Sequence, residues 1–219
     1  MKQKQPDHLQ VKILRPFSPR ILLGGLPDNI VDGLNKICDD TIADEEKRKK
    51  LYAGDSLIGQ VTEELEADIA NYQEFGNYLF NLLKTLYLHF EAECSSNGTA
   101  PNNVRRMAIH KAWFVRSFKG DYNPAHIHEN TAFSCIAFLK VPESIGDQNL
   151  KHKQKKAATE GRVDFIHGSA GMVTPNSYLV KPIVGDIYIF PATLSHTVYP
   201  FWGDGERRTF SCNMDLEFF

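Results

Sequence analysis

The second half of this chain consists of short apolar runs separated by turn-forming residues, and no other feature restricts the fold as strongly. From about Met107 onward each run has the length of a single β-strand, and Gly, Pro, Asn, Asp or Ser residues separate most of the runs. Strands at this spacing are typical of an all-β barrel or sandwich. The runs occupy residues 108–118, 131–141, 162–167, 177–184, 185–190 and 207–219.

The first half has helical periodicity instead. Apolar residues in its later part recur mostly three or four positions apart on one stripe, which predicts a long amphipathic helix. Before it, the segment from Asp28 to Leu51 predicts another helix, with Asp28 as its N-cap and an exposed charged run, 45–50, at its end. The stripe of the long helix comprises Leu65, Ile69, Tyr72, Leu79, Leu82, Leu86 and Phe90.

A segment rich in Ser, Asn, Gly and Pro, CSSNGTAPNNVRR, indicates a boundary between the two halves. We expect residues 1–95 to form a helical segment that packs on the barrel, because an apolar helix stripe must be buried against another surface. Residues 96–219 would then form the β core.

One insertion, residues 146–162, is too polar to belong to the core. We expect a solvated or mobile loop there, and an anion-binding lid is the alternative that the sequence leaves open. The insertion carries Lys151, Lys153, Lys155 and Lys156.

Composition excludes several classes of protein. The chain has 219 residues, of which 42% are hydrophobic, and this is enough for a packed core. A formal net charge of -2 gives no global field that would attract nucleic acid or an anionic membrane. No run approaches the ~18 apolar residues of a membrane span. The four cysteines lack disulfide-scaffold spacing and no apolar signal region is visible, so we expect a soluble cytoplasmic protein.

Three histidines are candidates for a metal site. His126 and His128 lie two positions apart in NPAHIHEN, at the edge of a strand-forming region, and such positions in a strand face the same side. His196 follows the strand GDIYIF and a Phe-Pro turn. Three imidazoles can form a facial set for a first-row metal such as iron, which leaves further positions open for other ligands.

The last strand alternates sharply between a polar and an apolar face. If the polar face lines the cavity that holds the imidazoles, Arg207 offers a guanidinium fork that matches a carboxylate bidentately, with the Thr209 hydroxyl two residues on. This arrangement suits an acidic cosubstrate. The polar face comprises Arg207, Thr209, Ser211, Asn213 and Asp215, and the apolar face comprises Arg208, Phe210, Cys212, Met214 and Leu216.

Taken together, these motifs resemble the iron(II)/2-oxoglutarate-dependent oxygenases. In detail the chain is similar to the prolyl-hydroxylase-like subgroup with NPxHxHxxxxxS before one strand and GER-x-[ST]-x-S-x-N in the last, which match NPAHIHENTAFS and GERRTFSCN here. The similarity covers residues 108–215. It implies a double-stranded β-helix, which is a jelly-roll barrel, with helices outside it.

The resemblance also implies a cofactor, a cosubstrate and their ligands. His126 and His196 match the iron(II)-binding histidines, and His128 occupies the place of the usual Asp or Glu. Strand alternation would turn the neighbouring Glu129 away from the metal. Arg207, rather than Arg208, matches the residue that grips the distal carboxylate of 2-oxoglutarate, and Thr209 matches its hydroxyl helper.

The implied reaction is a dioxygenase reaction in which decarboxylation of 2-oxoglutarate to succinate is coupled to oxidation of a prime substrate by dioxygen. Hydroxylation of a protein side chain or a small molecule is the expected outcome. Neither the prime substrate nor the oligomeric state is indicated by the sequence. Candidate substrate-binding residues near the site are Trp113, Arg116, Tyr122 and Asn123.

Two other hypotheses remain open. A three-histidine cupin, which could be a thiol dioxygenase, an isomerase or a binding module, would also place HIH five residues after Gly120 and His196 after Gly185 and Pro191. That hypothesis gives Arg207 no role. A metal-free jelly-roll protein would make the histidines incidental.

Overall fold

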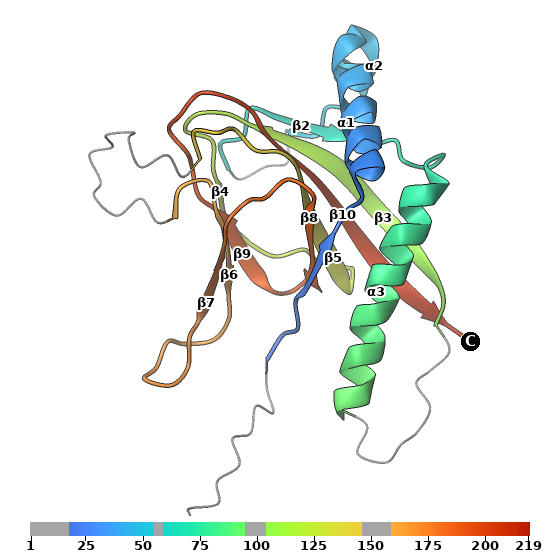
Figure 1. Ribbon diagram of the computed structural model, residues 1–219, viewed down its shortest axis with the longest axis vertical. Coiled ribbons are helices and arrows are strands. Elements are labelled where there is room, and N and C mark those ends of the chain that lie inside the picture. Colours follow the sequence, from blue (N-terminus) through green and yellow to red (C-terminus); the bar gives the residue numbers. More distant parts are fainter. Residues whose placement is uncertain (1–17, 55–58, 95–103, 146–158) are drawn as a thin grey trace, which may run out of the picture.

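The computed structural model describes residues 18–54, 59–94, 104–145 and 159–219. Within these ranges the chain forms two antiparallel β-sheets, with helices outside the larger one (Figure 1). The Lys-rich insertion from Lys151 to Lys156 and the predicted boundary at residue 95 lie outside the described residues. None of the described helices is long and apolar enough to span a membrane.

The large sheet has six strands in the order β1-β8-β5-β10-β3-β2. Its centre is the pair of β10 with β3 and β5, which runs antiparallel over almost the whole length of β10. The strands are β1 (Leu22–Gly25), β2 (Glu63–Glu66), β3 (Val104–Ser117), β5 (Phe133–Lys140), β8 (Asp186–Pro191) and β10 (Arg207–Phe218).

The small sheet has four strands in the order β4-β9-β6-β7. It lies across from the large sheet and closes the barrel on that side (Figure 1). Aromatic and aliphatic side chains from both sheets, including Phe138, Phe165 and Phe190, form a core between them. The strands are β4 (Asn123–His126), β6 (Val163–Ile166), β7 (Ser177–Val180) and β9 (Ser195–Val198).

The helices are α1 (Asp28–Ala43), α2 (Glu45–Lys50) and α3 (Gln73–Cys94). Both α1 and α3 cover the outer face of the large sheet and form a second core with it. In this core Phe75 of α3 meets Phe210 of β10 edge to face, with ring centroids 5.0 Å apart. The apolar face predicted for the last strand therefore packs under the helices, because Phe210, Cys212 and Met214 all belong to this core.

The long helix begins later than its apolar periodicity predicts. Leu65 lies in β2, and Ile69 and Tyr72 precede the first helical residue, Gln73. The segment EELE is compatible with a helix by composition, but it pairs with Trp113–Arg116 on the edge of β3. Tertiary pairing therefore overrides the local helical pattern.

The first helix also differs from its prediction. Asp28 is the first helical residue, Pro27 is the N-cap, and no side chain caps this end. The predicted single helix is interrupted at Asp44, whose carboxylate accepts a hydrogen bond from the backbone N–H of Lys47 and so caps α2. The charged run 45–50 is that second helix, and none of its residues is buried.

Deletion of residues 1–95 is expected to give an insoluble or unfolded protein. The deletion would remove β1 and β2 from the large sheet and would expose the apolar residues that α1 and α3 cover. Expression of residues 96–219, followed by size-exclusion chromatography and circular dichroism, checks this. A soluble, folded and active fragment would show that the division into a supporting segment and a β core has been misjudged.

Candidate metal and cosubstrate site

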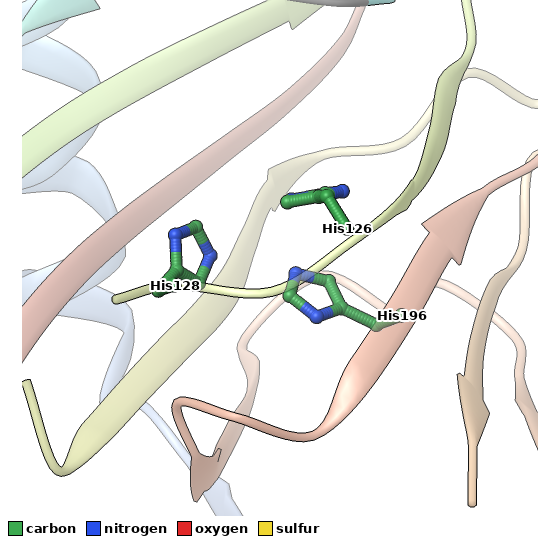
Figure 2. A group of neighbouring side chains, drawn as sticks. All are labelled: His126, His128 and His196. Carbon is green, nitrogen blue, oxygen red and sulfur yellow. The ribbon is translucent and has the colours of Figure 1, made fainter.

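Three imidazoles meet between the two sheets (Figure 2). His126 ends β4, His196 lies directly opposite it in β9, and His128 follows β4 in the chain. One potential ligand atom from each ring lies within 4.8 Å of those from the other two. The three predicted metal ligands are therefore within reach of a single ion.

Backbone carbonyls orient two of the rings. Nδ1 of His126 lies 2.8 Å from the carbonyl oxygen of Pro124, and Nδ1 of His196 lies 3.0 Å from that of Leu194. A carbonyl oxygen can only accept, so Nδ1 carries the proton in both rings. Nε2 is left with a free lone pair, which is the arrangement that a metal-binding histidine needs.

Burial keeps two of the imidazoles neutral. Burial, with a smaller contribution from the neighbouring His126, lowers the pKa of His128 to about 4 and the pKa of His196 to about 3. Phe190 and Phe165 pack near His196, with ring centroids 5.0 and 6.1 Å from its ring. At neutral pH these two rings therefore do not need to lose a proton before they bind a cation.

His128 reaches the cluster in a different way from the one that strand alternation predicts. β4 ends at His126, so His128 does not lie in a regular strand. Its backbone N–H donates a 2.9 Å hydrogen bond to the carbonyl oxygen of Ala192, in the segment between β8 and β9. Glu129 is exposed and is not part of the cluster.

Replacement of His128 by Asp is expected to retain or strengthen iron(II) binding. An ionised carboxylate brings a negative charge to the cation, whereas the imidazole that it replaces is neutral. Metal content of the anaerobically loaded His128→Asp protein, measured by mass spectrometry against the wild type, checks this. If the folded variant lost the metal, position 128 could not be the equivalent of a carboxylate ligand.

A cavity of about 280 Å³ contains the three histidines. Its walls come from both sheets: β2, β3, β5, β8 and β10 on one side, and β4 and β9 on the other. The polar face of β10 lines it, because Arg207, Thr209, Ser211 and Asn213 all contribute. The alternation predicted for the last strand therefore directs these four side chains toward the histidines.

Arg207 is a buried cation that forms no ion pair with any carboxylate in the described part of the chain. Among the described residues its guanidinium donates to the carbonyl oxygen of Gly161 (3.0 Å) and to the hydroxyl of Ser117 (3.1 Å), but its Nε has no partner. Burial lowers its pKa to about 10, which still leaves it charged at neutral pH. A buried, incompletely bonded guanidinium has the charge and the donor geometry that suit a carboxylate.

Arg208 points the other way, toward α1. Its side chain is 1% exposed and forms ion pairs with Glu206 (2.9 Å) and Asp39 (2.8 Å). It also donates to the side-chain oxygen of Asn35. These partners occupy Arg208 on the helical side of the sheet, whereas Arg207 faces the cavity.

The four candidate substrate-binding residues divide into two pairs. Trp113 and Asn123 line the cavity, and the Trp113 ring lies 5.6 Å from the ring of His128. Arg116 and Tyr122 do not line it. Arg116 lies on the opposite face of β3 from Trp113 and is ion-paired with Glu63 and Glu206, and Tyr122 is 41% exposed. Only the first pair can meet a ligand in this cavity.

The cavity also contains residues that sequence reasoning missed. Glu64 comes from β2, and Lys111 and Asn213 face each other in register across β3 and β10. Asn213 belongs to the predicted polar face but received no role. Glu64 could not be found from sequence, because its segment reads as part of a helix.

The fold places Glu64 in an unfavourable environment for a carboxylate. Burial raises its pKa from 4.5 to about 7, and the ammonium of Lys111 opposes this rise. Between these pH values the folded protein holds a proton that the unfolded chain has released. The free energy of unfolding therefore falls as pH rises through this window.

The Glu64→Gln variant is accordingly expected to gain stability over the wild type as pH rises from 4.5 to 7. The relative gain in the free energy of unfolding is on the order of 3 kcal/mol, because the pKa rises from 4.5 to about 7 and each unit of pKa shift corresponds to about 1.4 kcal/mol. Urea unfolding of both proteins at pH 5 and pH 8 measures it. A difference that is the same at both pH values would contradict the raised pKa.

Comparison with known proteins agrees with this geometry. The family model described as 2OG-Fe(II) oxygenase matches residues 111–213, which include the three histidines, Arg207 and Thr209. No curated protein matches the chain in sequence. The match begins at Lys111 in β3 and ends at Asn213 in β10, so it contains most of the strands that surround the cavity.

Solved structures with the same architecture include a prolyl-4-hydroxylase from Pseudomonas putida, with 12% identity, a TM-score of 0.55 and coverage of 89% of this chain and 91% of that one. A viral collagen prolyl hydroxylase from Paramecium bursaria Chlorella virus-1, solved as a 2-oxoglutarate complex, has 14% identity, a TM-score of 0.50 and coverage of 91% and 96%. SnoK, a non-haem α-ketoglutarate-dependent carbocyclase of nogalamycin biosynthesis, has 9% identity, a TM-score of 0.55 and coverage of 90% and 81%. At these identities the likeness establishes the fold, a double-stranded β-helix.

Proposed function

Residues 111–213 of this chain belong to the 2OG-Fe(II) oxygenase family, and from that premise we propose which residues carry out its reaction and on what kind of substrate. The protein is an Fe(II)- and 2-oxoglutarate-dependent dioxygenase. We assign iron(II) to His126, His128 and His196, and the distal carboxylate of 2-oxoglutarate to Arg207 and Thr209. The substrate is proposed to be a protein side chain or a small molecule that becomes hydroxylated.

The observation that supports this assignment best is the state of Arg207. A guanidinium that is 4% exposed, with an unpartnered Nε, lies in the same cavity as three clustered imidazoles. Among the described residues no carboxylate is ion-paired with it. A dicarboxylic acid with one end at the metal and the other at Arg207 fits both halves of this cavity. A three-histidine cupin would leave the guanidinium without a function.

Each part of the cavity then has a physical role. When bound, iron(II) would activate dioxygen, which is the oxidant, and 2-oxoglutarate would be the reductant that leaves as succinate and carbon dioxide. The carbonyls of Pro124 and Leu194 fix the tautomers of His126 and His196, so that each presents Nε2. Phe190 lines the cavity beside His196 and limits the entry of water. Ser117 holds one arm of the Arg207 guanidinium in place.

The similar structures support a substrate that is either a side chain or a small molecule. Two are described as prolyl hydroxylases and one as a carbocyclase of nogalamycin biosynthesis. No membrane or nucleic-acid partner is part of the proposal. We also propose that the protein acts in the cytoplasm, on the basis of its cysteine spacing.

The test is formation of succinate from 2-oxoglutarate by protein that has been loaded with iron(II) without oxygen and then exposed to it. Peptide and metabolite pools are added in parallel, and mass spectrometry follows the gain of one oxygen atom by a component. Succinate formation that requires iron(II) is expected. Oxygen consumption that is independent of 2-oxoglutarate would favour the cupin hypothesis instead.

A further inference from the structure

One carboxylate in the wall of the cavity has no part in the proposed metal set or in cosubstrate binding. Glu64 lies on β2, opposite Val115 of β3, and Val115 in turn lies opposite Thr209 of β10. Its side chain is 5% exposed and it lines the same cavity as the three histidines. The family model begins at Lys111, so β2 and Glu64 lie outside the matched region.

Glu64 lacks a close partner among the described residues. Its nearest cation is the ammonium of Lys111, with Nζ 3.9 Å from Oε1. This distance exceeds the roughly 3.2 Å limit of an N–H···O hydrogen bond. Lys111 is also 41% exposed along its side chain, so it can turn outward into solvent. A buried carboxylate whose only cation is distant and partly solvated retains unused capacity to accept hydrogen bonds.

A second unused acceptor lies in the same wall. Oδ1 of Asn213 is buried and has no hydrogen-bond partner in the described part of the chain. Asn213 is the register partner of Lys111, so it lies one strand further from β2 on the same face of the sheet. The wall therefore presents acceptor atoms on both sides of Lys111, and these require donors from a ligand.

An aromatic ring lies between these acceptors and the metal cluster. Nζ of Lys111 is 5.4 Å from the centroid of the Trp113 ring, and that ring is 5.6 Å from the ring of His128. The face of an indole attracts a cation. A cationic group at this wall would therefore be close enough to His128 for the carbon atoms next to it to lie near the metal.

We propose that Glu64 and Asn213, with the face of Trp113, form the recognition site for a cationic nitrogen group of the prime substrate. The group is an ammonium or a guanidinium, as in a lysyl or arginyl side chain or a small amine, and it takes the position that Lys111 occupies in the free protein. Its charge satisfies Glu64, and its remaining N–H groups can donate to Oδ1 of Asn213. This inference rests on the function proposed above and names the substrate class of that same cavity.

The experiment uses the full chain, loaded anaerobically with iron(II) and 2-oxoglutarate, and has two stages. In the first stage, an absorption band that grows as 2-oxoglutarate is added reports bidentate binding of the keto acid to the metal. Absence of that band would count against the proposed function itself. In the second stage, calorimetry measures the binding of Nα-acetyl-lysine methylamide and Nα-acetyl-arginine methylamide. Their uncharged analogues, with norleucine and citrulline side chains, are measured in parallel.

We expect at least one cationic probe to bind at least tenfold more tightly than its uncharged analogue. Glu64→Gln, which keeps the shape and removes the charge, should erase that preference while the 2-oxoglutarate band persists. Asn213→Ala should weaken the binding of the same probe by a smaller factor. Glu66→Gln is the matched control, because Glu66 lies two residues along the same strand but is exposed, and it should bind the probe like the wild type.

Three results would overturn the inference while leaving the proposed function intact, provided that the 2-oxoglutarate band is present. The first is equal affinity for the charged and uncharged probes, and the second is no binding of either cationic probe. The third is an undiminished charge preference in Glu64→Gln. Persistence of the band in each variant also shows that the cavity has folded, so that a loss of probe binding reports the missing side chain.

Discussion

Replacement of Arg207 by alanine is expected to weaken 2-oxoglutarate binding by roughly ten- to a thousandfold and to leave iron(II) binding unchanged. In the wild type the guanidinium is buried, and Gly161 and Ser117 hold two of its nitrogens. Those contacts are already made before the cosubstrate arrives, so little ordering is needed on binding. A charge-assisted pair in such a site contributes a few kcal/mol, and about 1.4 kcal/mol corresponds to a tenfold change in affinity.

The measurement is an anaerobic titration of 2-oxoglutarate into the iron-loaded proteins, monitored by the absorption band of the metal-bound keto acid. Arg207→Lys is a useful intermediate, because lysine keeps the charge but loses the bidentate fork. Arg208→Ala is the neighbouring control. It should bind 2-oxoglutarate like the wild type, although loss of its ion pairs with Glu206 and Asp39 should lower its stability. Equal affinity in wild type and Arg207→Ala would favour the cupin hypothesis.

Replacement of either His126 or His196 by alanine is expected to abolish stoichiometric iron(II) binding. Each variant removes one of the three clustered imidazoles, and the ring that is lost is one of the two whose tautomers are fixed by backbone carbonyls. The two remaining imidazoles bring no negative charge that could compensate for the lost ligand. We expect metal content near zero after desalting, and no keto-acid absorption band on addition of 2-oxoglutarate.

Two controls make this result specific. His89→Ala changes an exposed histidine on α3, 69% exposed along its side chain, and should retain full metal content. Circular dichroism of each variant establishes that the barrel is folded. Full metal content in both folded cavity variants would rule out this cluster as the iron site, whatever the family of the chain.

Most of the barrel could be predicted from the sequence, because alternation and turn residues are local signals. The runs at 108–118, 131–141 and 207–219 correspond to β3, β5 and β10. Side-chain alternation along β10 predicted the face on which Arg207 lies. Four strands carried too little signal. β1, β2, β4 and β9 lie outside the predicted apolar runs, and the pairing that makes them strands comes from partners distant in the chain.

The candidate site likewise combines residues that the sequence predicted with contacts that only the tertiary structure shows. The spacing of His126, His128 and His196 and the alternation around Arg207 were sufficient to name the five residues assigned to metal and cosubstrate, since each motif is confined to a few neighbouring positions. Only the tertiary structure showed that His128 is held by Ala192 outside any strand, and that Arg116 is committed to ion pairs away from the cavity. Both facts depend on long-range contacts that leave no periodic trace in the sequence.

The burial of Glu64 and its position in the cavity could be learned only from the tertiary structure. By itself EELE has the composition of an exposed helical turn, and nothing in it suggests a buried carboxylate. Pairing with the edge of β3 converts the segment into a strand and turns Glu64 into the cavity, where burial raises its pKa to about 7. Local patterns in the sequence, with the family resemblance that they carry, named the residues that we assign to the metal and the cosubstrate. Strand pairing alone decided which further groups face them, because it brings together residues that no local pattern connects.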